Sequence, residues 1–438
     1  MLGPPHVAII GGGVSGSVAL SELLRSSSTV RVTLFDQGRG VGGRASHRCV
    51  SANGAVVSPG AEEAWFKFDH GCQFFRADTS KFQERVLGPW LKDGVAAEWL
   101  GPFEALNGAK PFFGVPVDKR PVYAGVGGMH SLAAKPIAKA LTRGRVAINT
   151  GVRVGRVEHK DGNWELYGVG GRAALHDTPE AESKLVEADL LGTFDAVLVT
   201  DASMSAGSWH RASAGLPAAF IKEAALDTKC RAALFTAMVA FESPLGLEAG
   251  GITFDDDALW FASRTASKPG LSSLETECWT LVSTPHWAAQ QVAAVPMRDP
   301  ITGAFRPQTK EVLDGPAHAL LQAFQSALSP RLEKMPKAVY LTAQRWGSAF
   351  PVSAADDVKA AESLEILGTR YTTKRDLSLV SPPNCVDGKD YVASGTGLFY
   401  AGDYCSKSLP PGVEAAACSA LDAVAGILYE LETKADAR

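Results

Sequence analysis

The 438-residue chain lacks several features that would assign it to a class at once. No run of about 18 apolar residues is present, so we expect no membrane span. The formal net charge of -4 provides no basic surface for a nucleic acid or an anionic membrane. We therefore predict neither a nucleic-acid partner nor a membrane partner.

Metal and disulfide chemistry also find little support. The cysteines number seven, they are widely spaced, and none forms a C-x-x-C pair. The nine histidines form no H-E-x-x-H or other metal-binding spacing. We expect no bound metal and no disulfide framework, and hence a reducing compartment. The expected location is the cytoplasm, or an organelle stroma or matrix if a transit peptide has been removed.

What the chain does have begins with the stretch VAIIGGGVSG at residues 7–16. It predicts a strand over 6–10, a helix over 14–25 and a second strand over 31–35, which together form a β-α-β unit. Gly11, Gly13 and Gly16 lie between strand and helix, and Asp36 follows Gly16 by twenty residues. This spacing is typical of a dinucleotide site, with the pyrophosphate at the helix N-terminus and the acid on a ribose hydroxyl.

Two further segments favour FAD over NAD. The stretch GRGVGGRASH follows Asp36 and contains Gly42, Gly43 and Arg44, a second glycine pair that suits an elongated cofactor. A flexible solvated loop is the competing interpretation of this stretch. Near the C-terminus, a strand over 398–401 runs into Gly402 and Asp403. A long helix then opens at Gly412 and Val413, and its first N–H groups are expected to face the flavin.

These motifs resemble the flavin amine oxidase superfamily and, within it, the renalase-like FAD/NAD(P)-dependent oxidoreductases of the plant and algal branch. The resemblance rests on LFDQGRGVGGRASHR, FDHGCQFF, VYAGVGGMHSLAAKPIAKAL, AQRWGSAFP and AGDYCSKSLPPGVEAAACSA. The stretch from Leu259 to Ala288, which includes Ser267-Lys268-Pro269-Gly270, also carries it. Ala415 and Ala420 stand where relatives often have glycine. The stretches 168–188, 290–314 and 371–397 have the character of insertions.

The resemblance implies a fold class and a domain arrangement. We expect an α/β fold in which a Rossmann-like FAD-binding domain of the glutathione-reductase type is interleaved with an α+β substrate domain. The FAD-binding domain takes residues 1–78, 121–205 and 392–438, and the substrate domain takes 79–120 and 206–391. Val154 is expected to offer backbone contacts to adenine, with an ordinary strand residue as the alternative. The FAD is expected to be noncovalent, because Cys405 does not match the attachment cysteine of monoamine oxidases.

The flavin performs hydride transfer itself, so a catalytic triad is not expected. The candidate catalytic residues are His70, Trp287 and Arg345. His70 lies in a segment expected to approach the flavin, although a structural role competes. Trp287 is one of four tryptophans considered for a planar-substrate pocket, with Trp260, Trp279 and Trp346, and core packing is the alternative for each. Arg345 is a candidate for meeting an anionic substrate, and a structural ion pair is the equal alternative.

Three functions remain open. The first is oxidation of a reduced nicotinamide, including isomeric dihydro forms of NAD(P), with molecular oxygen as acceptor and hydrogen peroxide as product. The second is oxidation of an amine, for which neither an aromatic cage nor a lysine-held water can be placed. The third is an FAD-stabilised scaffold or assembly protein without turnover.

Overall fold

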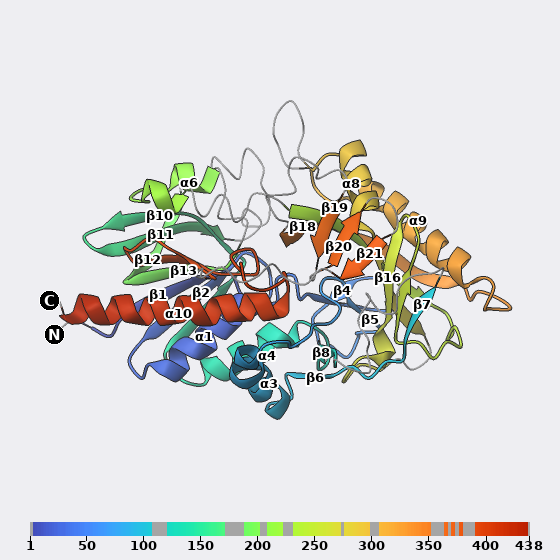
Figure 1. The fold of residues 1–438 in the computed structure, drawn as a ribbon, viewed down its shortest axis with the longest axis horizontal. Coiled ribbons are helices and arrows are strands. Elements are labelled where there is room, and N and C mark those ends of the chain that lie inside the picture. The colour runs from blue at the N-terminus through green and yellow to red at the C-terminus, as the bar shows by residue number, and fades with distance from the viewer. Residues whose placement is uncertain are drawn as a thin grey trace.

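The computed structural model contains a parallel β-sheet and a largely antiparallel one, which form two halves side by side (Figure 1). It describes residues 3–106, 121–170, 188–201, 208–221, 231–272, 276–297, 306–351, 363–366, 369–372, 376–379 and 390–436. Both chain ends lie at the outer end of the half that contains β1 (Figure 1).

The first sheet has the strand order β22-β23-β13-β1-β2-β9. Its strands are β1 (His6–Ile10), β2 (Arg31–Asp36), β9 (Val146–Thr150), β13 (Ala196–Val199), β22 (Val392–Ala393) and β23 (Leu398–Tyr400). Strand β1 pairs in parallel with β2 and β13, and only the edge strand β22 runs antiparallel. The predicted β-α-β unit is thus confirmed, because α1 (Val14–Ser26) connects β1 to β2.

Helices cover one face of this sheet. They are α1, α4 (Ser131–Leu141) and α10 (Val413–Asp436), and α10 lies along α1 (Figure 1). Alternate strand residues such as Ile9 and Leu34 point into the apolar cluster that these helices share. The short elements α2 (Ser80–Phe82), η1 (Gln83–Leu87) and α3 (Gly88–Lys92) also contribute side chains to this cluster. They therefore pack with the first sheet, although their sequence falls in the range expected for the substrate domain.

An antiparallel sheet covers the other face. It consists of β10 (Val152–Lys160), β11 (Asn163–Gly170) and β12 (Asp189–Phe194), and Figure 1 shows it across the parallel sheet from α10. Strand residues that point away from the helices, such as Ala8 and Phe35, pack against its side chains. The hairpin expected around Asp161 and Gly162 is confirmed, since β10 and β11 pair up to Lys160 and Asn163. The result is a three-layer α/β half.

The second large sheet has the order β18-β14-β17-β16-β15-β7. Its strands are β7 (Phe103–Leu106), β14 (Arg231–Phe241), β15 (Gly251–Phe254), β16 (Leu259–Arg264), β17 (Glu277–Ser283) and β18 (Ala338–Pro351). Helices α8 (Pro285–Ala294) and α9 (Lys310–Leu328) cover one face, which we call the distal face. The opposite, proximal face packs against β3, β5 and the apolar cluster of the first half.

Smaller elements complete the described chain. They are β3 (His47–Val50), β4 (Val56–Val57), β5 (Phe66–Asp69), β6 (Ala96–Glu98), β8 (Tyr123–Gly125), α6 (Ser208–Ala212), η5 (Thr265–Ser267), β19 (Ser363–Ile366), β20 (Thr369–Thr372) and β21 (Asp376–Leu379). Strand β3 joins the two halves, because it follows the second glycine loop and pairs with β5 beneath the second sheet. Most of the expected insertion 168–188 lies outside the described residues, as do 373–375 and 380–389 of the expected insertion 371–397. The third, 290–314, includes the end of α8 and the start of α9.

The described residues contain neither a membrane-spanning helix nor a metal-binding cluster. Among them, no helix combines the length and apolar character needed to cross a bilayer. Within the same ranges, no group of three or more His, Cys, Asp or Glu side chains is placed to hold a metal ion.

Candidate functional site

The first glycine turn connects β1 to α1 in the manner that the motif predicts. Gly11 has a φ of +111°, and a Cβ there would lie 2.6 Å from Thr200 Oγ1, so a side chain is excluded twice over. A Cβ at Gly16 would clash with the carbonyl oxygen of Gly11, which shows how closely helix and strand pack. Gly13 differs, because a Cβ there would meet nothing nearer than 3.8 Å. The turn thus leaves open space at Gly13 alone.

The N-terminus of α1 opens onto this space without a cap. Gly13 is its N-cap residue, no side chain accepts from its first N–H groups, and its first turn has no acidic residue. The Ser15 hydroxyl is buried there and has no hydrogen-bond partner. An uncapped helix terminus beside an unpartnered hydroxyl is suited to an anion. A dinucleotide diphosphate therefore fits the residues present.

Asp36 lies at the end of β2 and turns back toward the glycine turn. Its two carboxylate oxygens accept hydrogen bonds from Gly12 N and Gly38 N, each at 2.6 Å. Burial raises the pKa of Asp36 to about 6, with a further upward contribution from Asp201, although the two backbone donors oppose it. A carboxylate has about four acceptor positions, so two remain for ribose hydroxyls. The ribose contact itself stays a prediction.

The second glycine loop lies against the first. Gly42 N donates to Gly12 O at 2.9 Å, and a Cβ at Gly43 would be 3.4 Å from Gly13 Cα. The two loops therefore border the same open space. This packing against the first turn does not favour the alternative interpretation of the stretch 38–47 as a flexible solvated loop.

Arg44 and Asp403 are bound to each other, which the sequence did not indicate. Arg44 Nη1 donates to Asp403 Oδ2 at 2.9 Å, and Nη2 donates to Oδ1. The Arg44 side chain is 38% exposed, whereas that of Asp403 is 3% exposed. The contacts predicted for each of them with the cofactor stay predictions. The pair closes the second glycine loop onto the C-terminal strand, and Arg44 is its more accessible partner.

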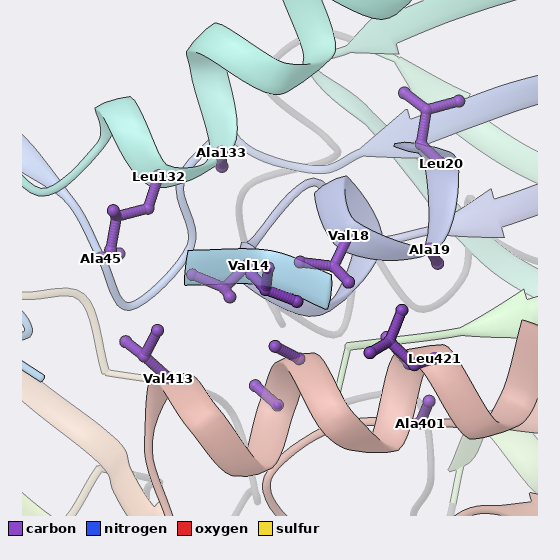
Figure 2. Packing of buried hydrophobic residues seen from close by; sticks show 14 of the residues in the cluster. Val14, Val18, Ala19, Leu20, Ala45, Leu132, Ala133, Ala401, Val413 and Leu421 are labelled. Atoms are coloured by element: carbon purple, nitrogen blue, oxygen red, sulfur yellow. The ribbon is translucent and has the colours of Figure 1, made fainter. Parts of the chain in front are cut away.

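The start of α10 reaches the same place. Val413 packs beside Val14 and Ala45, so the first residues of α10 and α1 lie close together (Figure 2). Gly412 precedes the helix with a φ of +149°, and Gly402 follows β23 with a φ of +157°. This packing is what we expect if the C-terminal segment closes the cofactor site. The contact between α10 and a flavin stays a prediction.

Val154 lies on the other side of the parallel sheet. Its side chain is fully buried in the cluster that includes Phe35, and the β10–β11 register shifts between Val154 and Arg156. The side chain thus belongs to the core, as the alternative interpretation held. The predicted backbone contact with adenine remains a prediction.

His70 lies between the two halves. Its carbonyl oxygen accepts from Trp346 Nε1 at 2.6 Å and from Thr236 Oγ1 at 2.9 Å, and its ring stacks on Trp346 with centroids 5.4 Å apart. The residue is 8% exposed, and its Nδ1 has no hydrogen-bond partner. Burial first, and the charge of Arg48 second, lower the pKa of His70 to about 3. His70 is therefore a neutral imidazole with an unused polar atom.

Trp287 and Arg345 lie on the other face of the second sheet from His70. Arg345 is opposite Phe235 in the β14–β18 register, and Phe235 packs on Trp287 with ring centroids 5.8 Å apart. Both belong to the distal face, where the Arg345 guanidinium donates to Arg306 O at 3.2 Å. Trp346 is opposite Leu234 and reaches His70 on the proximal face. The structure does not unite Trp287 and Arg345 with His70, so the three candidate catalytic residues do not line one site, and a catalytic role for any of them stays a prediction.

Trp279 and Trp260 also lie on opposite faces of the second sheet. Trp279 is fully buried in the distal cluster, where its Nε1 donates to Glu277 Oε1 at 2.7 Å. Trp260 belongs to the cluster on the proximal side. Of the four tryptophans considered for a pocket, Trp260 and Trp346 therefore lie on the face nearer the glycine loops.

The structure contains a buried charge cluster that the sequence analysis did not predict. Lys268 Nζ lies 3.0 Å from Asp69 Oδ2, and His47 Nδ1 lies 2.8 Å from Asp69 Oδ1, which also accepts from Met129 N at 2.8 Å. The Lys268, Asp69 and His47 side chains are each 1% exposed. Gln73 links the cluster to β16, because its Oε1 accepts from Lys268 at 3.1 Å and from Ser263 at 2.6 Å. The residues come from four segments, and no local pattern in the sequence connects them.

Comparison with known proteins supports the fold. Residues 9–86 match the family of NAD(P)-binding Rossmann-like domains. The whole fold is similar to cyclohexylamine oxidase from Brevibacterium oxydans IH-35A, with 15% identity and a TM-score of 0.53 over 98% of this chain and 100% of that one. It is also similar to a reduced UDP-galactopyranose mutase, with 9% identity and a TM-score of 0.60 over 98% and 94% of the two chains. A putrescine oxidase bound to putrescine gives 11% identity and a TM-score of 0.54 over 98% and 99%.

These similarities cover nearly the full length of each chain, so they describe one common architecture. The expected fold class, an α/β fold with a Rossmann-like dinucleotide-binding domain interleaved with a second domain, is confirmed. The proposed domain boundaries stay a prediction.

Proposed function

We propose that this chain is an FAD-dependent oxidoreductase that holds its cofactor noncovalently. The observation that carries the proposal is the meeting of two glycine loops at an uncapped helix N-terminus with an unpartnered serine hydroxyl. A single glycine turn serves many dinucleotides, whereas the second loop and the Arg44–Asp403 pair extend the site beyond the first turn. The similarity in fold to two amine oxidases supports the same class.

The residues would hold the cofactor in the order in which they lie along the site. The α1 N-terminus and Ser15 would bind the diphosphate, Asp36 the adenosine ribose and the backbone at Val154 the adenine. Arg44, held by Asp403, and the start of α10 would lie toward the flavin end. The flavin, when bound, supplies a two-electron acceptor for hydride.

We propose a reduced nicotinamide as the substrate, in particular the isomeric dihydro forms of NAD(P). The substrate would give up a hydride to the flavin and leave as NAD(P)+. Molecular oxygen would then take the hydride equivalent, which is two electrons and one proton, from the reduced cofactor and a second proton from solvent, giving hydrogen peroxide and the oxidised flavin. This choice of substrate is supported by the sequence from Leu259 to Ala288, which resembles that of renalase-like enzymes. The neutral His70 ring is stacked on Trp346 on the proximal face and has an unpartnered Nδ1, which suits an uncharged planar group nearby.

Oxidation of an amine is the second candidate, because two of the similar structures are amine oxidases. Amine substrates carry positive charge at neutral pH, and carboxylates are the usual partners of such charges. Asp69 is the carboxylate nearest to His70 in sequence. Because it is already bound to Lys268 and His47, it does not favour the binding of a positively charged amine beside His70. A scaffold that keeps FAD without turnover is the third candidate.

An anaerobic reduction experiment separates these three functions. The yellow protein is mixed with the dihydronicotinamides made by nonselective reduction of NAD+, with putrescine and with cyclohexylamine, and the flavin absorbance is followed. Our proposal predicts that a dihydronicotinamide bleaches the flavin fastest. Bleaching by an amine alone would select the amine oxidase, and a flavin that no reductant bleaches would select the scaffold.

A further inference from the structure

The buried cluster of Lys268, Asp69 and His47 contains one carboxylate and two bases. Burial would lower the pKa of His47, but its hydrogen bonds with Asp69 and Cys49 raise that pKa to about 9. Burial would likewise raise the pKa of Asp69, but the Lys268 charge and the His47 contacts bring it well below its usual range. At neutral pH the three side chains therefore carry two positive charges and one negative charge. Their neighbours Gln73 and Ser263 add none.

An unbalanced buried charge has a cost that the cluster alone does not offset. Removing an ion from water remains unfavourable even after the protein relaxes around it, and one carboxylate compensates only one of two cations. The uncompensated positive charge would be stabilised by an anion that binds outside the cluster but close to it.

The cluster lies directly behind the second glycine loop. The segment that follows Asp69 is bonded to this loop, since Cys72 N donates to Arg44 O at 2.8 Å. On the other side, His47 stacks on His130 with ring centroids 5.1 Å apart. The backbone of His130 in turn borders Gly42, where an added Cβ would lie 3.6 Å from His130 Cβ. The cluster is thus connected to the second glycine loop through His130 at Gly42 and through Cys72 at Arg44, the residue proposed to lie toward the flavin end.

Close packing fixes His47 in this position. Gly128 has a φ of +117°, and a Cβ there would lie 2.5 Å from His47 Nδ1. Gly127 N also donates to Pro269 O at 2.9 Å, next to Lys268. The turn that precedes α4 therefore holds both cationic members of the cluster.

We propose that Lys268, Asp69 and His47 form an electrostatic element of the cofactor site, which makes this site bind the anionic state of the flavin more tightly than the neutral state. This inference rests on the proposed FAD site. The charge is buried, so mobile ions screen it little, and a unit charge retains a substantial interaction beyond contact distance. The three residues act through the electric field and need no contact with the cofactor.

Sulfite provides a probe that needs no turnover. Its sulfur lone pair forms a bond with oxidised flavin, and the displaced electron pair remains on the ring system, which becomes anionic. The dissociation constant of this adduct, measured by loss of visible absorbance, therefore reports how well the site accepts negative charge.

Four variants separate charge from structure. Lys268→Met and His47→Gln each remove one positive charge, and we expect each to weaken sulfite binding roughly three- to tenfold. Lys268→Arg keeps the charge and should bind sulfite within about twofold of the wild type. Asp69→Asn breaks the hydrogen bonds of the cluster, but His47 then loses the partner that keeps it protonated, and the net charge stays at one. We expect its sulfite affinity to stay near the wild-type value despite a lower melting temperature.

Lys139→Met serves as the matched control, because Lys139 forms an exposed ion pair with Asp93. The inference is overturned if Lys268→Met binds sulfite as the wild type does, or if sulfite affinity follows melting temperature with Asp69→Asn lowest. If Asp69→Asn does not fold, the comparison of Lys268→Met with Lys268→Arg decides the question. A colourless wild-type protein that refuses FAD would overturn the proposed function as well, whereas a yellow wild type with unchanged variants overturns this inference alone.

Discussion

Replacement of Gly13 by valine should remove FAD binding and leave the fold intact. Gly13 has φ and ψ of −78° and −166°, which valine adopts readily, and an added Cβ meets no protein atom within 3.8 Å. The branched side chain would instead fill the space that a diphosphate needs next to the α1 N-terminus. Gly13 is also the N-cap of α1. Exchange of glycine for valine at such a position costs about 1 kcal/mol of helix stability at most.

The expected magnitudes therefore differ widely. We predict a loss of FAD affinity of at least about a hundredfold, or ~2.8 kcal/mol, with a change in the melting temperature of the apoprotein of no more than about 2–4 °C. FAD titration by fluorescence quenching and thermal unfolding of the apoprotein measure the two effects. Gly16→Ala is the contrasting variant, because its Cβ would clash with Gly11 O and should destabilise the fold itself. A Gly13→Val protein that folds and binds FAD normally would refute the assignment of the turn.

Four further outcomes are expected. Asp36→Ala should weaken FAD binding by about 1.5–3 kcal/mol through the loss of charge-assisted hydrogen bonds to the ribose, as measured by the same titration. Val413→Pro should retain FAD but slow flavin reduction in stopped-flow experiments, because it removes one N–H from the start of α10, and an unchanged rate would argue against a contact with the flavin. Trp287→Phe should lower the melting temperature and leave the rate of flavin reduction unchanged, since Trp287 packs on the distal face. The folded-state pKa of His47 is raised to about 9. The stability that the protonated ring contributes is therefore complete below about pH 6.5 and is lost as the pH rises through 9. The melting temperature of the wild type should fall more between pH 7 and pH 10 than that of His47→Gln.

Local patterns in the sequence predicted the parts of the fold that local chemistry determines. The strand at 6–10, the glycine turn and the helix after it follow from hydrophobic periodicity and from the steric demands at Gly11 and Gly16. The hairpin around Asp161 and Gly162 follows from turn chemistry in the same way, with φ above +50° at both residues.

Contacts between distant residues were not accessible in this way. Arg44 and Asp403 are 359 positions apart, and Lys268 and Asp69 are 199 positions apart. Each of these four residues lies in a stretch that carries the family resemblance, but no local pattern indicates that these stretches contact each other. The pairing depends on how the second sheet docks on the first half.

The separation of Arg345 from His70 has a different cause. Arg345 and Trp346 are adjacent in sequence and point to opposite faces of the sheet, as successive strand residues must. A one-residue difference in register exchanges the two faces, and the sequence alone does not determine the register. Trp346 therefore lies beside His70, whereas Arg345 lies beneath the helices of the distal face.

The most direct test of the central claim is the visible absorbance spectrum of the purified protein, recorded before and after acid denaturation. We predict a flavin spectrum in the native protein, with the yellow colour entirely in the supernatant after acid treatment and identified there as FAD. A protein that is colourless and does not take up added FAD would contradict the account. A yellow pellet would contradict its noncovalent form.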